Sequence, residues 1–465
     1  MSDLPSGWEW AKLRDIVTRI EAGKSFTCEP RPARDDEWGV IKVSAMTWGE
    51  FRESENKAVP DGRGIDPRHE IAPGDLLVSR ANTVEYVGAP VLVHSCRPRL
   101  LLSDKSLRLV VANEIDRKWL LHALSSPSIR RQISQRSTGQ QESMRNISQQ
   151  ALLEMDIPVP PLAEQRRIVT KIESLLSHVS AATENVLASG VRLKLLSKRV
   201  LVESVPATGR PGWRVLTVGQ AGKVDLGRQR HPDWHTGPNM RPYLRVANVF
   251  EDRIDLRDVM QMDFPPEVFE RFRLTPGDIL LNEGQSPEYL GRPAVYQGEP
   301  AEMAFTNSLL RFRAHEGIDP AWALLVFRRH MHAGRFMKEV RITTNIAHLS
   351  ASRFKEVEFP VPPIEEQRAI VAQTKERLDG LARLADSVQL AKVRAGQLRE
   401  ALLVEAFAGR LVEQDSADEP ASELLARIRA QRVVPKQRGR RAAKELAAPA
   451  TRAIGTDFQQ GELPL

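Results

Sequence analysis

Cysteines and long apolar runs are the scarcest features of this 465-residue sequence. Only Cys28 and Cys96 are present, which excludes a disulfide-stabilised scaffold and a four-cysteine zinc site. No segment approaches the ~20 consecutive apolar residues that a membrane-spanning helix needs, and residues 1–16 lack the basic start and apolar stretch of an export signal. We therefore expect a cytoplasmic protein without a membrane partner.

Catalytic motifs are missing as well. The stretch EAGKS at 21–25 resembles the end of a phosphate-binding loop, but Thr18 stands where that motif requires its first glycine. The Pro-Pro pairs lack the Asn or Asp and the aromatic residue of an adenine methyltransferase motif. His231 and His235 are four residues apart, but Pro232 lies between them and no third metal ligand is evident. We predict a chain without its own catalytic site, metal or cofactor.

Neither charge is present in large excess, yet the balance is basic. The formal net charge is +7 and the isoelectric point is about 9.4. Residues 413–465 hold nine Lys/Arg and eight Asp/Glu, so residues 1–412 carry a net charge of +6. The excess therefore belongs to the folded part of the chain, where it favours an anionic partner such as nucleic acid.

The dominant feature that is present is an internal repeat. The sequence IPVPPLAEQRRIV begins at residue 157, and FPVPPIEEQRAIV begins at residue 359. In addition, PGDLLVSRANTVEYVGAPVLV (73–93) aligns without a gap on PGDILLNEGQSPEYLGRPAVY (276–296). Because repeats determine architecture, we expect two similar modules, each followed by a proline-rich segment and a helical stretch.

Each module has the pattern of a mixed α/β fold. Short runs rich in β-branched residues, such as 40–46, predict strands, and the Pro-Gly pairs before Asp75 and Asp278 predict turns that lead into strands. We interpret these two aspartates as turn residues and not as catalytic acids. Segments 116–126 and 319–331 have helical spacing of apolar residues and an Asp at the start, so we expect helices there.

The pattern changes after each proline-rich segment. X-Pro steps keep the chain extended, and proline is tolerated at a helix start, so this segment predicts a stiff elbow between a module and a long helix. Beyond it, apolar residues alternate three and four positions apart, which is typical of a coiled-coil seam, and the other copy is the expected partner of each helix. The predicted seam residues are Ile168, Ile172, Leu175, Val179, Leu193, Leu196, Leu381, Leu384, Val388, Leu398 and Leu402.

With these features the chain resembles the specificity subunits of type I DNA restriction-modification systems. The repeated elbow, the two modules, the long helices and the ending EAFAGRLV (405–412) with DEPASELLARIRAQR (418–432) carry the resemblance. The expected fold is α+β, with two target-recognition domains joined by two antiparallel helices in a pseudo-twofold arrangement. The predicted boundaries are 1–156 for recognition domain 1, 157–205 for the first elbow and spacer helix, 206–358 for recognition domain 2, 359–412 for the second elbow and spacer helix, and 413–465 for the tail.

The resemblance implies a non-catalytic, DNA-binding subunit for host defence and DNA methylation. Each module would read one half of an asymmetric, split site in double-stranded DNA, and the helices would hold the modules about one helical turn, ~34 Å, apart. Two methyltransferase subunits and motor-nuclease subunits would assemble on the chain. S-adenosylmethionine, ATP and magnesium are expected in those partner subunits and not in this chain.

Candidate DNA contacts lie where the two copies match in frame but differ in chemistry. Arginine can bind guanine, Asn or Gln can bind adenine, and Glu can accept from the amino group of cytosine. The segments 79–83 and 282–286 form one such pair, and those just before each elbow form another. The candidates in these segments are Ser79, Arg80, Asn82, Thr83, Arg145, Asn146, Asn282, Glu283, Gln285, Ser286, Thr343 and Asn345. In the matched loops EAGKS (21–25) and DLGRQR (225–230), Lys24, Arg228 and Arg230 are candidates for phosphate contacts.

Two other functions are compatible with the same residues. One is a coiled-coil scaffold that holds protein partners and has no DNA selectivity. The other is a restriction or modification enzyme with an unrecognised catalytic site. In the tail, residues 421–432 predict a short amphipathic helix, and the composition of the following residues is typical of disorder.

Overall fold

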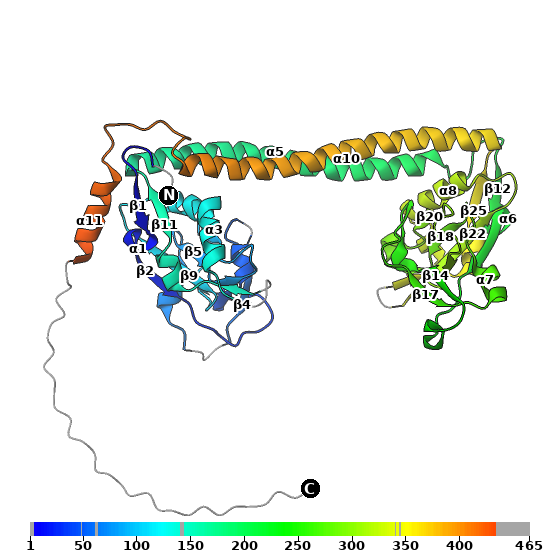
Figure 1. The fold of residues 1–465 in the computed structure, drawn as a ribbon, viewed down its shortest axis with the longest axis horizontal. Helices are drawn as coiled ribbons and strands as arrows, with labels where there is room; N and C mark the ends of the chain where they lie inside the picture. Colours follow the sequence, from blue (N-terminus) through cyan, green and yellow to red (C-terminus); the bar gives the residue numbers. More distant parts are fainter. Residues whose placement is uncertain are drawn as a thin grey trace, which may run out of the picture. The chain divides into compact units, whose positions relative to one another are not determined.

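The computed structural model describes residues 4–47, 49–60, 64–139, 144–339, 341–343 and 346–433 (Figure 1). The chain forms two compact units, Met1–Ser174 with Glu400–Leu465, and Leu175–Arg399. Both contain helices and antiparallel sheet, so the predicted α+β class with repeated modules is confirmed. The division between the units falls inside two long helices, α5 (Leu162–Ser204) and α10 (Ile364–Phe407). The five predicted domain boundaries therefore stay a prediction.

The first unit is built on a four-stranded antiparallel sheet with the order β2-β9-β5-β7. A smaller sheet, β4-β3-β8, supplies the second layer, and an apolar core that includes Leu77, Val91 and Leu100 lies between them. The strands are β1 (Glu9–Lys12), β2 (Val17–Ala22), β3 (Gly39–Ile41), β4 (Asn56–Ala58), β5 (Leu76–Ser79), β6 (Ala81–Asn82), β7 (Pro90–Leu92), β8 (Leu100–Leu101), β9 (Ser106–Val111), β10 (Arg145–Asn146) and β11 (Asp156–Val159).

The second unit repeats this topology. Its main sheet has the order β13-β22-β18-β20, and its smaller sheet has the order β17-β14-β21. The register agrees as well, because Leu77 pairs with Arg108 and Leu280 pairs with Arg311. The strands are β12 (Arg214–Thr217), β13 (Gly222–Leu226), β14 (Met240–Leu244), β15 (Val249–Phe250), β16 (Arg253–Ile254), β17 (Met260–Asp263), β18 (Ile279–Asn282), β19 (Gly284–Gln285), β20 (Pro293–Val295), β21 (Ala304–Phe305), β22 (Leu309–Ala314), β23 (Arg341–Thr343), β24 (Ile346–His348) and β25 (Glu358–Val361).

Helices predicted from the Asp start signals are confirmed in both units. Asp116 accepts hydrogen bonds from two backbone N–H groups at the start of its helix, and Asp319 accepts one. Trp119 and Trp322 are fully buried at equivalent positions of these helices. The short helices are α1 (Leu13–Ile16), α2 (Arg117–Ser125), α3 (Pro127–Arg136), α4 (Gln149–Leu153), α6 (Val218–Ala221), α7 (Pro266–Phe272), α8 (Pro320–His332) and α9 (Ala351–Lys355).

The repeated glutamine of each elbow has the same structural role in both units. Gln165 is fully buried, and its Nε2 donates to the carbonyl oxygen of Pro160 at 3.0 Å while its Oε1 accepts from the N–H of Asp116 at 3.0 Å. In the second copy, Gln367 donates to the oxygen of Pro362 at 2.9 Å and accepts from the N–H of Asp319 at 2.9 Å. Each glutamine thus ties the proline segment to the helix of its own module.

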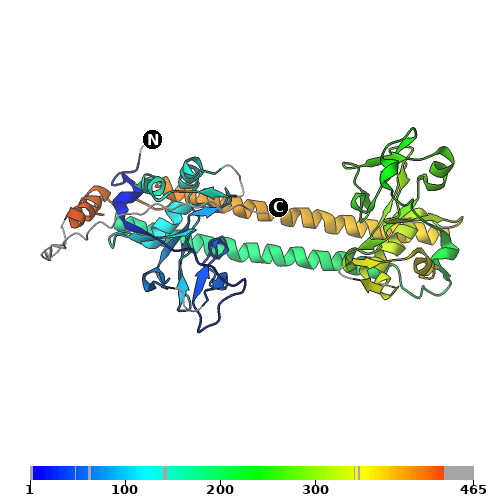
Figure 2. The ribbon, with the colours of Figure 1, turned by 90° about the horizontal axis from the view of Figure 1, so that it is seen from below.

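Residues 175–204 of α5 and 364–399 of α10 run side by side in opposite directions (Figure 2). Thr374 Oγ1 donates to Ser204 Oγ at 2.9 Å, and Arg399 Nη2 donates to Ser180 Oγ at 2.9 Å. The antiparallel pairing predicted for the two helices is present in this unit.

The predicted seam is only partly correct. Ile168 and Ile172 are fully buried, and Leu175, Val179, Leu193, Leu381, Val388 and Leu402 are half-buried. In contrast, Leu196, Leu384 and Leu398 are 46%, 54% and 51% exposed, so the prediction that they are core residues is corrected. A heptad pattern predicts knobs packed into holes, whereas this helix pair leaves its apolar side chains only partly covered.

The tail helix α11 (Ala421–Val433) packs on the first unit, and Figure 1 shows it in red. The N–H of Ala421 donates to the oxygen of Gly7 at 2.9 Å, and Leu424 and Leu425 are fully buried. Arg432 Nη2 donates to the oxygen of Val17 at 2.8 Å. The predicted amphipathic helix is therefore confirmed, and the segment predicted to be disordered lies outside the described residues. Among the described residues, no helix is both long and apolar enough to cross a membrane.

Candidate nucleic-acid interface

The two sequence segments predicted to contact DNA in the first module lie next to each other. Strand β6 directly follows Arg80 and pairs with β10, which comes just before the elbow. In this ladder Asn82 is opposite Arg145, and Ala81 is opposite Asn146. The structure thus combines both segments in one small sheet.

The second module builds the same arrangement from its own segments. Strand β19 pairs with β24, with Gly284 opposite His348 and Gln285 opposite Ala347. Strand β23 extends this sheet on the other side of β24. The candidate Thr343 lies in β23 and its side chain is outside the described part of the chain, as is the whole of Asn345.

Matching backbone hydrogen bonds show which residues are equivalent. The N–H of Ile147 donates to the oxygen of Arg80 at 3.0 Å, and the N–H of Leu349 donates to the oxygen of Glu283 at 2.8 Å. Arg80 therefore corresponds to Glu283. Asn146 and His348, which stand directly before the donors Ile147 and Leu349, correspond to each other as well. A common backbone scaffold presents different side chains in the two modules.

In each module a third segment, the turn at Lys105 or Ser308, is hydrogen-bonded to the same residue, Arg80 or Glu283. The N–H of Arg80 donates to the oxygen of Lys105 at 2.8 Å, and the N–H of Glu283 donates to the oxygen of Ser308 at 3.0 Å. The Lys105 side chain is exposed. The sequence analysis did not identify Lys105 because this turn lies far along the chain from the strand that it contacts.

The exposed polar side chains in the first module can all donate hydrogen bonds, and that of Arg80 can only donate. Arg80, Thr83 and Asn146 are exposed. Asn82 is half-buried; its Oδ1 accepts from the N–H of Thr83 at 2.9 Å, and its Nδ2 donates to Ser79 Oγ at 3.4 Å. Gln285 repeats this geometry in the second module, because its Oε1 accepts from the N–H of Ser286 at 3.1 Å. The half-buried Ser286 supplies only its backbone to this bond.

The side chains of Glu283 and His348 are within hydrogen-bond distance of each other in the second module. His348 Nδ1 lies 3.2 Å from Glu283 Oε2, and the side chains are 52% and 23% exposed, respectively. The sequence analysis missed His348, although it stands directly before the buried Leu349 as Asn146 stands before the buried Ile147.

Three candidates are buried and do not present their side chains at the surface. Ser79 and Asn282 are fully buried at the ends of equivalent strands. The guanidinium of Arg228 lies 4.0 Å from the ring centre of Trp234 and 4.7 Å from that of Phe264, and its burial lowers its pKa. These side chains pack the module, so the prediction that they are free to contact DNA is corrected.

The remaining candidates have different surroundings. Lys24 and Arg230 are exposed and stay predictions as phosphate contacts. Arg145 is half-buried, and its Nη atoms donate to the oxygens of Ser137 at 2.8 Å and Gly139 at 3.1 Å. These bonds hold the guanidinium of Arg145 against residues 137–139, so it is less free to bind a base.

The residues considered for catalysis have structural roles. Asp75 accepts from the N–H of Ala72 at 2.9 Å, and Asp278 accepts from the N–H of Thr275 at 2.8 Å, which confirms both as turn residues. Asp278 is also bound by Arg313 through two hydrogen bonds of 2.6 and 2.7 Å. Within the part of the chain that the structure describes, no cluster of His, Cys, Asp and Glu is suited to a metal ion.

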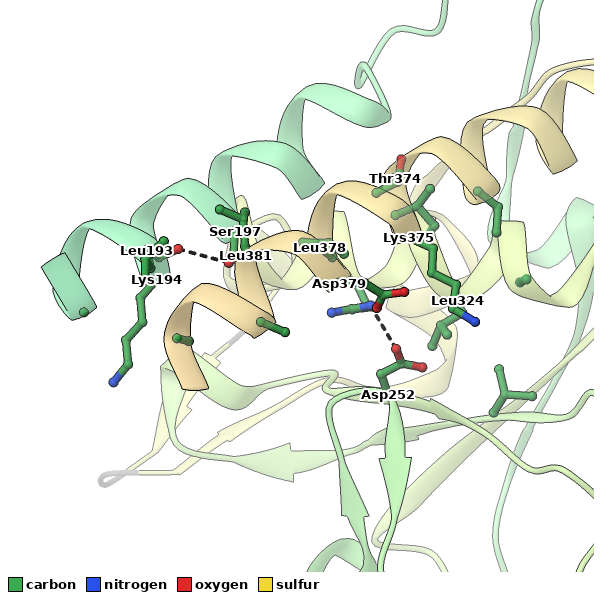
Figure 3. Close-up of a pocket in the computed structure, with 18 of the residues that line it drawn as sticks. Leu193, Lys194, Ser197, Asp252, Leu324, Thr374, Lys375, Leu378, Asp379 and Leu381 are labelled. Atoms are coloured by element: carbon green, nitrogen blue, oxygen red, sulfur yellow. Dashed lines mark hydrogen bonds and ion pairs between the residues drawn. The ribbon is translucent and has the colours of Figure 1, made fainter. Parts of the chain in front are cut away.

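A separate groove lies in the second unit between the helix pair and α8 (Figure 3). Its volume is about 1060 Å³, and it is lined by apolar side chains such as Leu193, Leu378 and Leu381. Lys375 and Asp379 lie at its polar side. The groove has no catalytic arrangement of side chains, but it offers a large apolar surface.

Known proteins resemble this chain in sequence. The EcoEI type I restriction enzyme specificity subunit of Escherichia coli is 36% identical over 173 residues, which are 37% of this chain and 29% of that protein. The EcoKI specificity subunit of Escherichia coli K12 and the StySPI specificity subunit of Salmonella potsdam are each 23% identical. They cover 92% and 93% of this chain, respectively, and 96% of their own lengths.

Over nearly its whole length this chain is similar to type I restriction enzyme specificity subunits. The prediction that it is a targeting subunit and not itself an enzyme agrees with this family. No family model matches the chain.

Solved structures share the fold of this chain. A chain from work on complex assembly and conformational transition of the type I R-M system has a TM-score of 0.67 at 21% identity, covering 88% of this chain and all of its own length. The HsdS subunit from Thermoanaerobacter tengcongensis has a TM-score of 0.54 at 23% identity and covers 88% of this chain and 98% of its own.

Proposed function

We propose that this specificity subunit reads a bipartite, asymmetric site in double-stranded DNA, with one half-site for each module. One observation carries the proposal, namely that the two modules hold their loops with matching backbone bonds while the exposed polar side chains differ. Two readers of different base sequences need such a common scaffold with variable contacts. The net charge of +6 in residues 1–412 favours a polyanionic partner such as DNA.

The same proposal assigns the helix pair a role in assembly. Leu187, Val191 and Leu195 form a stripe at helical spacing and are 49%, 60% and 62% exposed. Exposed apolar stripes of this kind mark binding surfaces for partner helices. We propose that methyltransferase subunits pack helices against this stripe and the groove beside it, and that motor-nuclease subunits join the assembly. S-adenosylmethionine, ATP and magnesium would then be bound by those partners, in the cytoplasm.

Mapping of methylated adenines tests this function. DNA would be sequenced from cells that carry this chain with its methyltransferase partner, and from cells that lack only this chain. We expect a new motif of two short defined blocks separated by several unspecified bases. If both proteins fold and assemble but the methylation pattern does not change, the chain is a protein scaffold without sequence selectivity.

A further inference from the structure

We propose that Glu283 and His348 act as one recognition unit that binds an exocyclic amino group of a base, the N4 amino group of cytosine or the N6 amino group of adenine. Arg80, at the position equivalent to Glu283, would instead bind the acceptor edge of guanine in the other half-site. This inference rests on the proposed function, and it adds His348 to the residues that determine specificity.

The position of His348 depends on a glycine in the facing strand. Gly284 is opposite His348 in the β19–β24 ladder. A Cβ atom added to Gly284 would lie 3.0 Å from both Cε1 and Nδ1 of the His348 ring. The first module has Ala81 opposite the smaller Asn146 at these positions. The absence of a side chain at Gly284 therefore leaves room for the imidazole beside Glu283.

The contact between Glu283 and His348 determines which groups face a ligand. An ionised carboxylate only accepts hydrogen bonds, so the hydrogen of a neutral imidazole is on Nδ1, where it is donated to Glu283 Oε2 across 3.2 Å. In that tautomer Nε2 of His348 carries a lone pair and is an acceptor. The pair thus presents the carboxylate oxygens and a ring nitrogen, all of which accept.

A set of acceptors selects among bases in the major groove. Cytosine and adenine present amino hydrogens there, whereas guanine and thymine present the oxygens O6 and O4. Facing a base oxygen, the Glu283 carboxylate would lose water without gaining a hydrogen bond, which disfavours the wrong base. Arg80 has the opposite preference, because a guanidinium only donates and matches O6 and N7 of guanine. Charge reversal on a common scaffold therefore gives the two modules different base preferences.

Amino-deleted bases test this inference directly. The assembled complex would bind duplexes of its mapped site in which a single adenine is replaced by purine, or a single cytosine by 2-pyrimidinone. We expect that deletion of one amino group, in one half-site, weakens binding of the unchanged complex by about tenfold or more. The double variant Glu283→Ala/His348→Ala should lose the same affinity on the natural duplex and become insensitive to that deletion.

Matched controls keep the result interpretable. Glu316→Ala removes an exposed acidic residue in a loop of the same module and should retain full sensitivity to the deletion. In the double variant, sensitivity to changes in the other half-site should be unchanged, which shows that the complex is folded and assembled. The inference is overturned if, for every amino deletion in the bipartite site, the double variant loses as much affinity as the unchanged complex does. The absence of any bipartite site would overturn the proposed function as well.

Discussion

Gln165 Oε1 accepts a hydrogen bond from the backbone N–H of Asp116 at 3.0 Å, across 49 positions of sequence. The same side chain donates to the oxygen of Pro160 in the elbow. Asp116 is the residue that caps helix α2. One buried amide therefore connects the module helix, the proline segment and the start of the long helix, which accounts for the repeated glutamine.

Replacing this glutamine should destabilise its unit. Gln165→Ala leaves the Asp116 N–H and the Pro160 oxygen buried without partners, so the free energy of unfolding should fall by about 2 kcal/mol. Gln367→Ala should behave alike in the second unit. Urea denaturation measures the change, and Gln373→Ala on the exposed face of α10 is the control, with an effect within about 0.5 kcal/mol. Equal effects of Gln165→Ala and Gln373→Ala would contradict the role of the elbow amide.

The fully buried His330 predicts a loss of stability in mild acid. Its Nδ1 accepts from Arg329 Nη1 at 3.1 Å, and its Nε2 donates to the oxygen of Glu358 at 2.9 Å, so the ring is neutral. Burial lowers the pKa of His330 to about 4, whereas the pKa in an unfolded chain is ~6.5. Between these values the unfolded state binds more protons. The contribution of His330 to the free energy of unfolding is complete above pH ~6.5 and falls as the pH decreases toward 4.

A pH series of unfolding free energies checks this expectation. The stability of the unchanged chain should fall between pH 6.5 and 4 by up to ~1.4 kcal/mol per unit more steeply than that of His330→Phe. The phenylalanine variant removes the titrating group and keeps an aromatic ring of similar size. Parallel pH profiles for the two proteins would show that His330 does not titrate in this way.

Arg228 and Arg230 should respond differently to substitution although they are two residues apart. Arg228→Ala removes a guanidinium packed between Trp234 and Phe264, so we expect a loss of about 2 kcal/mol in unfolding free energy. Arg230→Ala should leave stability unchanged within about 0.5 kcal/mol and reduce the slope of DNA affinity against salt by about one. Denaturation and salt-dependent binding separate the two outcomes. A stable Arg228→Ala protein with weakened DNA binding would restore Arg228 as a DNA contact.

The exposed stripe of α5 predicts a partner contact. Val191→Glu and Leu195→Glu place charges on side chains that are 60% and 62% exposed, so the isolated chain should keep its stability. Both variants should lose the methyltransferase subunit in size-exclusion chromatography, because a helix packed there would bury an unpaired carboxylate. Arg192→Glu, which changes an adjacent exposed residue, is the control. Retention of the partner by both stripe variants would place the contact elsewhere.

Local patterns were sufficient to predict much of the fold. The Asp start signals predicted α2 and α8, and the repeat predicted two modules with long helices after each elbow. The burial of Arg228 was missed because Trp234 and Phe264 approach it only through the tertiary fold. Sequence spacing carries no information on such contacts.

The seam and the candidate interface show two further limits of sequence patterns. Heptad spacing identifies apolar residues on a helix but not the surface that covers them, and Leu384 and Leu398 are exposed here. His348 was missed because the two modules have little sequence identity at this site. Its equivalence to Asn146 is seen from its pairing with Gly284 in the sheet. Alignment of Ser148 with Ser350, which both cap short helices, would have placed His348 at the position of Asn146.

Exchange of one loop tests the central claim, that each module reads its own half-site. Residues 79–86 would be replaced by the sequence of residues 282–289 together with Asn146→His, and methylated adenines would be mapped in the presence of the methyltransferase partner. The account predicts a bipartite motif in which one block changes while the other block and the spacer are retained. A folded, assembled and active complex that methylates the original motif, or one in which both blocks change, would contradict it.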